Sequence, residues 1–451
     1  MNLGIINKSK KVSPKVWLGL ILLAYLGIMA YGLRGYIPWT SVNFIIGLVG
    51  LPFTINGRAA KSTSGKLYIA ACILALLSML VPMKIVLFMA FGLVVMKLAE
   101  GIWGRMSGLT FLTICFMSPA VQYLAGIFSF PIRLGLTGIA GNLLNFSGTA
   151  TTVAGNVISF GGNDYSVDPA CMGLKMMLTS LLCGVFIIAI MQKKQQKTIG
   201  GLWVISSLII VFLLNIVSNL IRIIILVFCD IRPENKMHGV TGLLCLVAYV
   251  LLPSVYIIQK IIKNKGKDYT VETNIAPLPF QPRQFILSHS IILPLMVGAI
   301  IVMNVKQTMK TIPVLTQVEG YTASYYDSDI IRYKNNTSLV YIKKIGGPFV
   351  AEHNPAMCWL GSGYEFKSIT TQVTACTKIY CGILSKGKEK LYTAWWFDNG
   401  EYRTLEQLDW RWKALKGDKP FSVINVTATD KATLDKEVER IIRGNVFWQG
   451  M

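Results

Sequence analysis

Three side chains with complementary chemistry interrupt otherwise apolar stretches of this sequence: Cys171, Arg222 and His238. A cysteine thiolate is a strong nucleophile, an imidazole transfers protons near neutral pH, and a guanidinium stabilises developing negative charge. If the fold brings them together, the three residues predict covalent catalysis by a cysteine. The elements that must position them are apolar helices, so the pattern of those helices decides whether the set can form.

The surroundings of Cys171 indicate the beginning of a helix. Pro169 and Gly173 flank it, a pairing typical of a sharp turn into a helix. Unpaired backbone N–H groups at a helix N-terminus favour the thiolate. A buried structural cysteine is the alternative, and it is the usual role of Cys in an apolar helix. We name Gly173 as a candidate for substrate binding.

Arg222 lies within a long apolar run. An arginine inside an apolar helix costs about 2.5–3.5 kcal/mol on insertion scales, and less near the interface. Stabilisation of a thiolate or an oxyanion would account for that cost, and snorkelling to lipid head groups is the alternative. Asn219 is one helical turn earlier on the same face, where its amide could orient the guanidinium or a substrate.

His238 is one of only three histidines, and it precedes another apolar run. Imidazole is the usual partner of a nucleophilic cysteine, whereas a surface-loop histidine is the alternative. Three histidines, with no His-Glu-x-x-His pattern and no paired Cys-x-x-Cys, argue against a dedicated metal site. We expect no metal and no organic cofactor.

Composition predicts a polytopic α-helical membrane protein. Hydrophobic residues make up 53% of the 451 residues, charged residues only 15%, and the mean hydropathy is +0.53. Apolar runs of about 20 residues can cross a bilayer as helices. We predict about nine transmembrane helices, at residues 16–33, 37–55, 67–83, 85–103, 108–127, 171–191, 199–228, 239–262 and 285–303.

Positive charge predicts the orientation. Seventeen Lys and Arg residues lie in one set of connections, against five in the opposite set: Arg34, Lys84, Arg133, Arg232 and Lys236. The richer side is expected to be cytoplasmic, with the N-terminus inside and residues 304–451 outside. Cys171, Arg222 and His238 then meet at the outer face. The net charge of +22 is thus a topology signal, and we expect contact with membrane lipids rather than nucleic acid.

The sequence divides into a membrane domain, residues 1–303, and a more polar domain, residues 304–451. The second shows strand-like alternation at 338–342 and 391–396 and the pattern of a closing helix at 430–443, which predict an extracytoplasmic α+β domain. Two of its cysteines (Cys358, Cys376 and Cys381) could form a disulfide. Within the membrane domain, residues 128–169 predict an interfacial or re-entrant segment followed by a hairpin that turns at 161–164.

The order and spacing of Cys171-Met-Gly-Leu, Asn219-Leu-Ile-Arg222 and His238-Gly resemble the motifs of the exosortase/archaeosortase family, over residues of about 100–262. The resemblance implies a membrane-embedded cysteine transpeptidase of the bacterial inner membrane. Such enzymes cut the C-terminal tail of exported proteins, a motif followed by a transmembrane helix and basic residues, and pass the acyl group to a surface acceptor. By this resemblance Cys171 is the nucleophile, His238 the acid/base and Arg222 the stabiliser. Cys-Met-Gly replaces the family's usual Cys-Ser-Gly, so any role of that Ser hydroxyl is absent.

Residues 353–364 resemble the signature of the exosortase-associated domain. The fused arrangement is most similar to the exosortase N type. His353 and Cys358 are candidates for a secondary site that assists acceptor binding or a second thiol step. A structural turn with a packed cysteine is an equally good interpretation.

Three other functions remain open at the level of sequence. A non-proteolytic component of polysaccharide biosynthesis or export, or a transporter, would not need Cys171. A polyprenyl-linked glycosyltransferase would use carboxylates at the outer face, for which Asp164, Asp168, Asp230 and Glu234 are available. The third is a protease without transfer activity.

Overall fold

The computed structural model describes residues 14–55, 65–81, 83–103, 106–148, 150–167, 174–231, 235–268, 282–308, 315, 317–327, 330–348, 359 and 364–448. These residues divide into two compact units. Unit 1 comprises residues 1–122, 175–215 and 246–309, and unit 2 comprises residues 123–174, 216–245 and 310–451. Each unit is described separately below.

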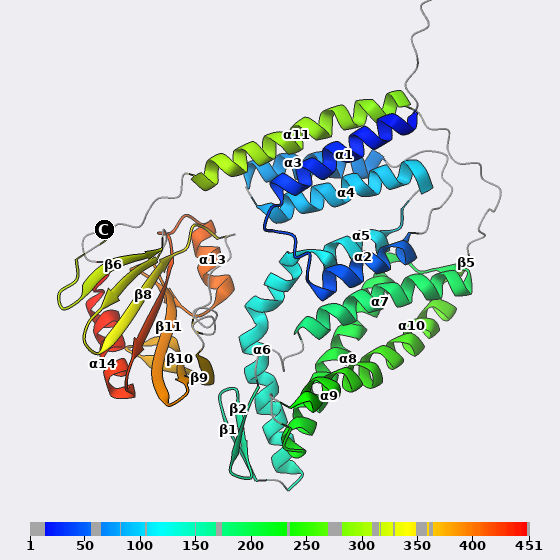
Figure 1. Cartoon of the computed structure of the whole chain (residues 1–451). Helices are drawn as coiled ribbons and strands as arrows, with labels where there is room; N and C mark the ends of the chain where they lie inside the picture. Colours follow the sequence, from blue (N-terminus) through cyan, green and yellow to red (C-terminus); the bar gives the residue numbers. More distant parts are fainter. Residues whose placement is uncertain are drawn as a thin grey trace, which may run out of the picture. The chain divides into compact units, whose positions relative to one another are not determined.

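Apolar helices account for most of the chain up to residue 308 (Figure 1). They are α1 (Pro14–Gly32), α2 (Val42–Thr54), α3 (Gly65–Leu80), α4 (Lys84–Trp103), α5 (Gly108–Met117), α6 (Pro119–Phe146), α7 (Leu174–Gln195), α8 (Gly201–Phe228), α9 (Lys236–Leu246), α10 (Leu252–Lys265) and α11 (Pro282–Thr308).

The helices support a membrane protein. Four helices in the described part of the chain are long and apolar enough to cross a bilayer: Met176–Gln195, Gly201–Phe228, Lys236–Lys265 and Leu287–Val305. Shorter apolar helices occur at Gly19–Gly32, Val42–Thr54, Gly65–Leu80 and Gly108–Met117. Every predicted span contains a helix, but the number of nine crossings stays a prediction.

The expected helix over 108–127 is interrupted, which corrects that part of the prediction. Helix α5 ends at Met117, and Ser118 is extended, with φ −68° and ψ 137°. The cause is Pro119, whose ring disfavours the helical conformation at the preceding residue and whose position at the start of α6 needs no N–H donor. Helix α6 then continues to Phe146, through the segment that we expected to be interfacial or re-entrant.

A second proline alters the helical geometry between α9 and α10. Residues Val247–Leu251 form a π-helical turn, and the N–H of Leu252 donates to the carbonyl of Val247, five residues back. Pro253 follows directly. A proline has no N–H and its ring crowds the carbonyl four residues earlier, and a widened turn relieves that crowding. The continuous helical segment therefore persists from Lys236 to Lys265.

Two hydrophobic clusters hold unit 1 together. One joins α1, α3, α4 and α11, which lie side by side in Figure 1, through buried residues such as Tyr25, Ala71, Val94 and Met296. The other joins α5, α7, α8 and α10. Small residues allow close helix contact: a Cβ added at Gly50 would lie 2.0 Å from the ring of Phe186.

A three-stranded antiparallel meander lies between α6 and α7 in the sequence. Its strands are β1 (Thr151–Ala154), β2 (Val157–Phe160) and β3 (Asn163–Ser166). The predicted turn at Gly161-Gly162 is confirmed, but the single hairpin is wrong because a second turn, Gly155-Asn156, adds a strand. Both turns use glycines with positive φ, which glycine adopts without steric cost.

The C-terminal part of unit 2 is a sheet of eight antiparallel strands. In chain order they are β6 (Thr322–Asp327), β7 (Ile330–Lys334), β8 (Ser338–Lys344), β9 (Glu365–Thr374), β10 (Thr377–Lys386), β11 (Glu389–Asp398), β12 (Arg403–Thr404) and β13 (Ser422–Ala428). The spatial order is β6-β7-β8-β13-β11-β10-β9, and β12 pairs with β11. The two predicted strands are confirmed as parts of β8 and β11. A further two-stranded pair joins β4 (Lys197–Thr198) and β5 (Lys267–Asp268) in unit 1.

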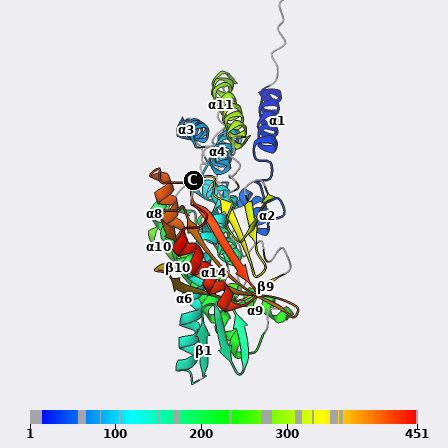
Figure 2. The ribbon, with the colours of Figure 1, turned by 90° about the vertical axis from the view of Figure 1, so that its left-hand side faces the viewer.

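Helices cover both faces of the central strands. Helix α14 (Lys431–Gly444), which confirms the predicted closing helix, packs its apolar stripe of Leu434, Val438, Ile441 and Ile442 near Trp396 (Figure 2). The neighbouring Phe397 lies in another cluster with Trp410 of α13 (Gln407–Leu415). Because successive strand residues point to opposite faces, the two helices bury both sides, and every residue of β13 is buried.

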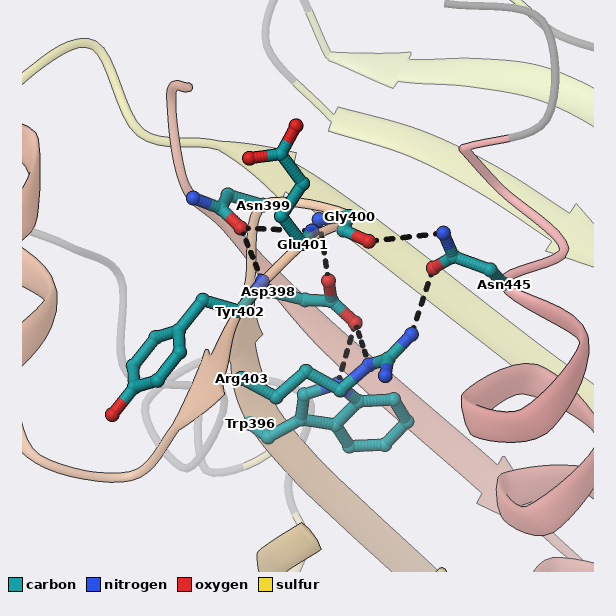
Figure 3. Close-up of polar contacts among 8 residues, drawn as sticks. All are labelled: Trp396, Asp398, Asn399, Gly400, Glu401, Tyr402, Arg403 and Asn445. Carbon is teal, nitrogen blue, oxygen red and sulfur yellow. Dashed lines mark hydrogen bonds and ion pairs between the residues drawn. The ribbon is translucent and has the colours of Figure 1, made fainter. Parts of the chain in front are cut away.

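A buried carboxylate fixes the turn between β11 and β12 (Figure 3). Asp398 is 1% exposed and accepts hydrogen bonds from Trp396 Nε1 at 3.0 Å, Arg403 Nε at 2.8 Å and the Gly400 N–H at 2.7 Å. Arg403 in turn donates to Asn445 Oδ1 at 2.7 Å. Asn445 follows α14 in the left-handed conformation, so the cluster ties the sheet to the end of that helix.

Asp398→Ala is expected to destabilise the sheet domain strongly, because it leaves the partly buried Arg403 guanidinium and the buried indole N–H of Trp396 without their acceptor. Breaking a buried pair in this way costs about 3–5 kcal/mol, or roughly 10 °C in Tm. Intrinsic tryptophan fluorescence of the full chain in detergent measures the change. Glu401→Ala is the control, because its surface ion pair with Lys419 contributes at most about 1 kcal/mol. Equal Tm values for the two variants would contradict the assignment.

Cys376 and Cys381 both carry free thiols in this structure, and Cys358 lies outside the described residues. Burial, and secondarily the nearby Asp435, raises the pKa of the Cys381 thiol to about 12. Cys376 is exposed in the turn between β9 and β10.

Iodoacetamide at pH 8 is expected to alkylate Cys376 well before Cys381 in the folded chain, because only the thiolate reacts and a pKa near 12 leaves roughly one Cys381 in ten thousand ionised. Peptide mapping by mass spectrometry gives both rates. In urea the two rates should converge. Equal rates in the folded protein would show that Cys381 is not buried.

Candidate functional site

Helices α8 and α9 lie against each other in opposite directions. Ser218 Oγ donates to the carbonyl of Cys245 at 3.0 Å, and four residues further along α8, Arg222 Nη2 donates to the carbonyl of His238 at 3.4 Å. The α8 partner moves from residue 218 to residue 222 while the α9 partner moves from residue 245 back to residue 238. This order shows that the two helices are antiparallel. The sequence-predicted Arg222 and His238 are therefore brought together.

The guanidinium of Arg222 is buried. The side chain is 3% exposed, so it does not extend to the surface of the structure as a snorkelling arginine would. Burial of an arginine among apolar helices is tolerated when polar groups are directed at it. The His238 carbonyl is one such group, and it comes from the backbone.

His238 lies in the first turn of α9, and its placement follows from the residue before the helix. Asn235 acts as the N-cap, because its Oδ1 accepts the N–H of Met237 at 3.0 Å and its carbonyl accepts the N–H of His238 at 2.9 Å. The cap fixes where α9 begins and so places both the carbonyl and the half-buried imidazole of His238. Asn235 is not among the residues predicted from the sequence, although Asn before an apolar run is a capping signal.

Asn219 shares the face of α8 that bears Arg222. It is 6% exposed, and its amide nitrogen has no hydrogen-bond partner among the described residues. A buried donor without an acceptor costs about 1–3 kcal/mol. An amide held in this way next to an arginine is suited to donate to a carbonyl or an oxyanion.

Four of the predicted site residues lie outside the described residues: Cys171, Gly173, His353 and Cys358. The structure does describe both sides of the segment that contains Cys171. Val167, four residues before it, is 3% exposed, and its N–H donates to the carbonyl of Asn156 at 2.8 Å. Helix α7 begins at Leu174, three residues after it.

One hydrophobic cluster joins the start of this segment to the helix that bears Arg222. Val167, Ile158 and Tyr165 of the meander region pack in a cluster with Ile223 and Val227 of α8, and with buried residues of α6. The Tyr165 hydroxyl also donates to Asp230 Oδ1 at 2.6 Å, just past the end of α8. The meander is thus fixed to the C-terminal half of α8 by apolar packing and by a hydrogen bond.

The hydrogen bond between Tyr165 and Asp230 involves one of the four carboxylates that a glycosyltransferase could use. Asp230 is exposed and bonded to Tyr165. The side chain of Asp164, together with Asp168 and Glu234, lies outside the described residues. Within the described part of the chain, no group of three or more His, Cys, Asp or Glu residues could hold a metal ion.

Comparison with known proteins identifies the membrane region. Residues 58–254 match the family model described as transmembrane exosortase. No curated protein and no solved structure matches the chain. The matched residues extend from the connection before α3 into α10 and contain Cys171, Arg222 and His238. Over these residues the chain is similar to the transmembrane exosortase family.

Proposed function

We propose that the protein is a cysteine transpeptidase or protease that removes the C-terminal sorting tail of exported proteins. Exosortases act on exported proteins that carry a C-terminal sorting signal. The observation that carries the proposal is the buried Arg222, directed from α8 at the first turn of α9, where His238 lies. A buried cation can stabilise a thiolate or an oxyanion, and this one contacts the backbone of the residue whose imidazole would transfer protons.

The chain geometry supports the inclusion of Cys171. Four residues separate it from Val167, and four residues span at most about 14 Å between Cα atoms. Val167 belongs to the cluster that contains Ile223, the residue after Arg222. The length of the chain therefore allows Cys171 to reach the C-terminal half of α8.

In the proposed reaction, His238 takes the proton of the Cys171 thiol, and the sulfur attacks the carbonyl carbon of a substrate peptide bond. Arg222 stabilises the oxyanion, and the Asn219 amide is available as a second donor. Collapse of the tetrahedral intermediate breaks the C–N bond, and the imidazolium protonates the leaving amine. The resulting thioester is released by an amine, another nucleophile or water.

The substrate class follows from the predicted topology. The site lies at the extracytoplasmic face of the inner membrane, with the N-terminus in the cytoplasm and residues 304–451 outside. A substrate that is anchored by its own C-terminal helix, with a recognition motif before it and basic residues after it, presents its cleavage point at that face. Residues 304–451 form the fused exosortase-associated domain in this proposal, with His353 and Cys358 available for the acceptor.

Cys171→Ala is expected to abolish tail removal, because Cys171 supplies the nucleophile in the proposed reaction. The C-termini of exported membrane proteins, compared by mass spectrometry between cells that express the native chain and the variant, give the result. One or a few proteins should keep a motif–helix–basic tail only with the variant. Cys183→Ala, in the middle of α7, is the matched control and should process normally. If both variants process every tail, the peptidase proposal fails and the export and transport functions gain support.

Arg222→Lys is expected to lower the rate of tail removal at least about 100-fold, the usual effect of losing a donor to an oxyanion. Lysine keeps the charge but cannot reach two acceptors with a planar fork. The rate is measured with purified protein and the tail peptide that the Cys171→Ala comparison identifies. Lys236→Gln, at the exposed first residue of α9, removes a charge nearby and should have little effect. Native activity in Arg222→Lys would contradict the role of Arg222 as a donor to the oxyanion. It would show that a positive charge at this position is sufficient, as expected for an arginine that only snorkels.

A further inference from the structure

The turn between β1 and β2 contacts the edge of the C-terminal sheet. Asn156 Oδ1 accepts the N–H of Ile369 at 2.9 Å, and both residues are buried, at 2% and 4% exposure. Ile369 belongs to β9, which is the last strand of its sheet. The contact therefore joins residues 213 positions apart in the sequence, within the same compact unit.

Both backbone groups of Ile369 face this turn. Its N–H donates to Asn156, and its carbonyl oxygen would lie 2.4 Å from a Cβ placed on Gly155. In an antiparallel strand the N–H and C=O of a residue point to the same side, so at this position β9 presents a free pair of groups away from β10. An open strand edge is a recognition surface, and here the Gly155-Asn156 turn occupies it.

Asn156 also contacts the segment that leads to the nucleophile. Its carbonyl accepts the N–H of Val167 at 2.8 Å, four residues before Cys171. Asn156 thus connects two parts of the unit. Its side chain bonds to the edge of the sheet, and its backbone carbonyl bonds to Val167, just before the Cys171 segment.

We propose that the sheet domain positions the Cys171 segment through the Gly155-Asn156 turn, and that Asn156 is a positioning residue for the nucleophile. The inference rests on the proposed function. It gives the fused domain a role that does not depend on His353 or Cys358. Ile369 of β9 bonds to the side chain of Asn156, and the carbonyl of Asn156 bonds to Val167, four positions before Cys171.

Two glycines of the meander provide a matched pair for the test. Gly155 and Gly161 have nearly the same backbone conformation, with φ of +62° and +58°. An added Cβ meets the Ile369 carbonyl at Gly155, whereas nothing lies within 4 Å at Gly161. Gly155→Ala and Gly161→Ala therefore impose similar backbone strain, but only Gly155→Ala pushes the turn away from β9.

Hydrogen exchange of the full chain in detergent reads docking directly. The Ile369 amide should exchange at least about tenfold faster in Gly155→Ala and in Asn156→Ala, because its acceptor is displaced or removed. Gly161→Ala should leave that amide protected. Unchanged exchange in both test variants would overturn the contact, and with it the inference.

Two further readouts separate positioning from general destabilisation. In Gly155→Ala and Asn156→Ala, kcat for cleavage of the tail peptide should fall about tenfold with KM nearly unchanged, and the rate of Cys171 alkylation by iodoacetamide should change with it. Asn425→Ala, which removes a buried amide from inside the sheet, should lower the Tm without changing the alkylation rate. Faster exchange at Ile369 with native kcat and native Cys171 alkylation would overturn the positioning role.

The Cys171→Ala comparison keeps the two proposals distinguishable. If that variant still processes tails, the proposed function fails, while exchange at Ile369 and alkylation of Cys171 still decide whether the turn positions the segment. If Cys171→Ala abolishes processing but Gly155→Ala matches Gly161→Ala in every readout, the proposed function stands and the inference about Asn156 is wrong.

Discussion

A single buried guanidinium constrains the arrangement of the helices around the candidate site. A charge inside an apolar bundle is stable only where polar groups are directed at it, and Arg222 finds one in the backbone carbonyl of His238. The start of α9, which Asn235 caps, fixes the position of that carbonyl. The position of the cap, the antiparallel crossing of α8 and α9 and the burial of Arg222 therefore depend on one another, because a shift in any of them would break this hydrogen bond.

The helical part of the fold was largely predictable, because apolar runs of about 20 residues have few alternatives in a membrane protein. The interruption at Ser118 was missed although Pro119 stood in the sequence, since the hydropathy of the run continues across it. The sheet domain was predicted from two strands and one helix, and both strands and the helix are present. The order of its strands depends on pairing between distant segments, which alternation of side chains does not specify.

The candidate site shows the same division. Residue type and predicted topology placed Arg222 and His238 at the same face of the membrane. In the structure, the Arg222 side chain contacts the His238 carbonyl. The atom that Arg222 contacts is a backbone carbonyl, however, and every residue type offers one, so no sequence pattern could have indicated it. Asn156 was missed for a related reason: Gly-Asn signals a turn, but the residue that the turn contacts is 213 positions away.

The edges of the sheet connect these observations to the fused domain. Strand β13 is buried along its whole length, with a strand on each side. Its backbone groups are therefore not available to bind another segment. Strand β9 has a partner on only one side, and an open edge must be covered or it becomes a site of unintended pairing. At Ile369 the Gly155-Asn156 turn covers this edge, and the carbonyl of Asn156 also bonds to Val167. The backbone groups of Ile369, which would be open to unintended pairing in an isolated sheet domain, therefore connect that domain to the meander.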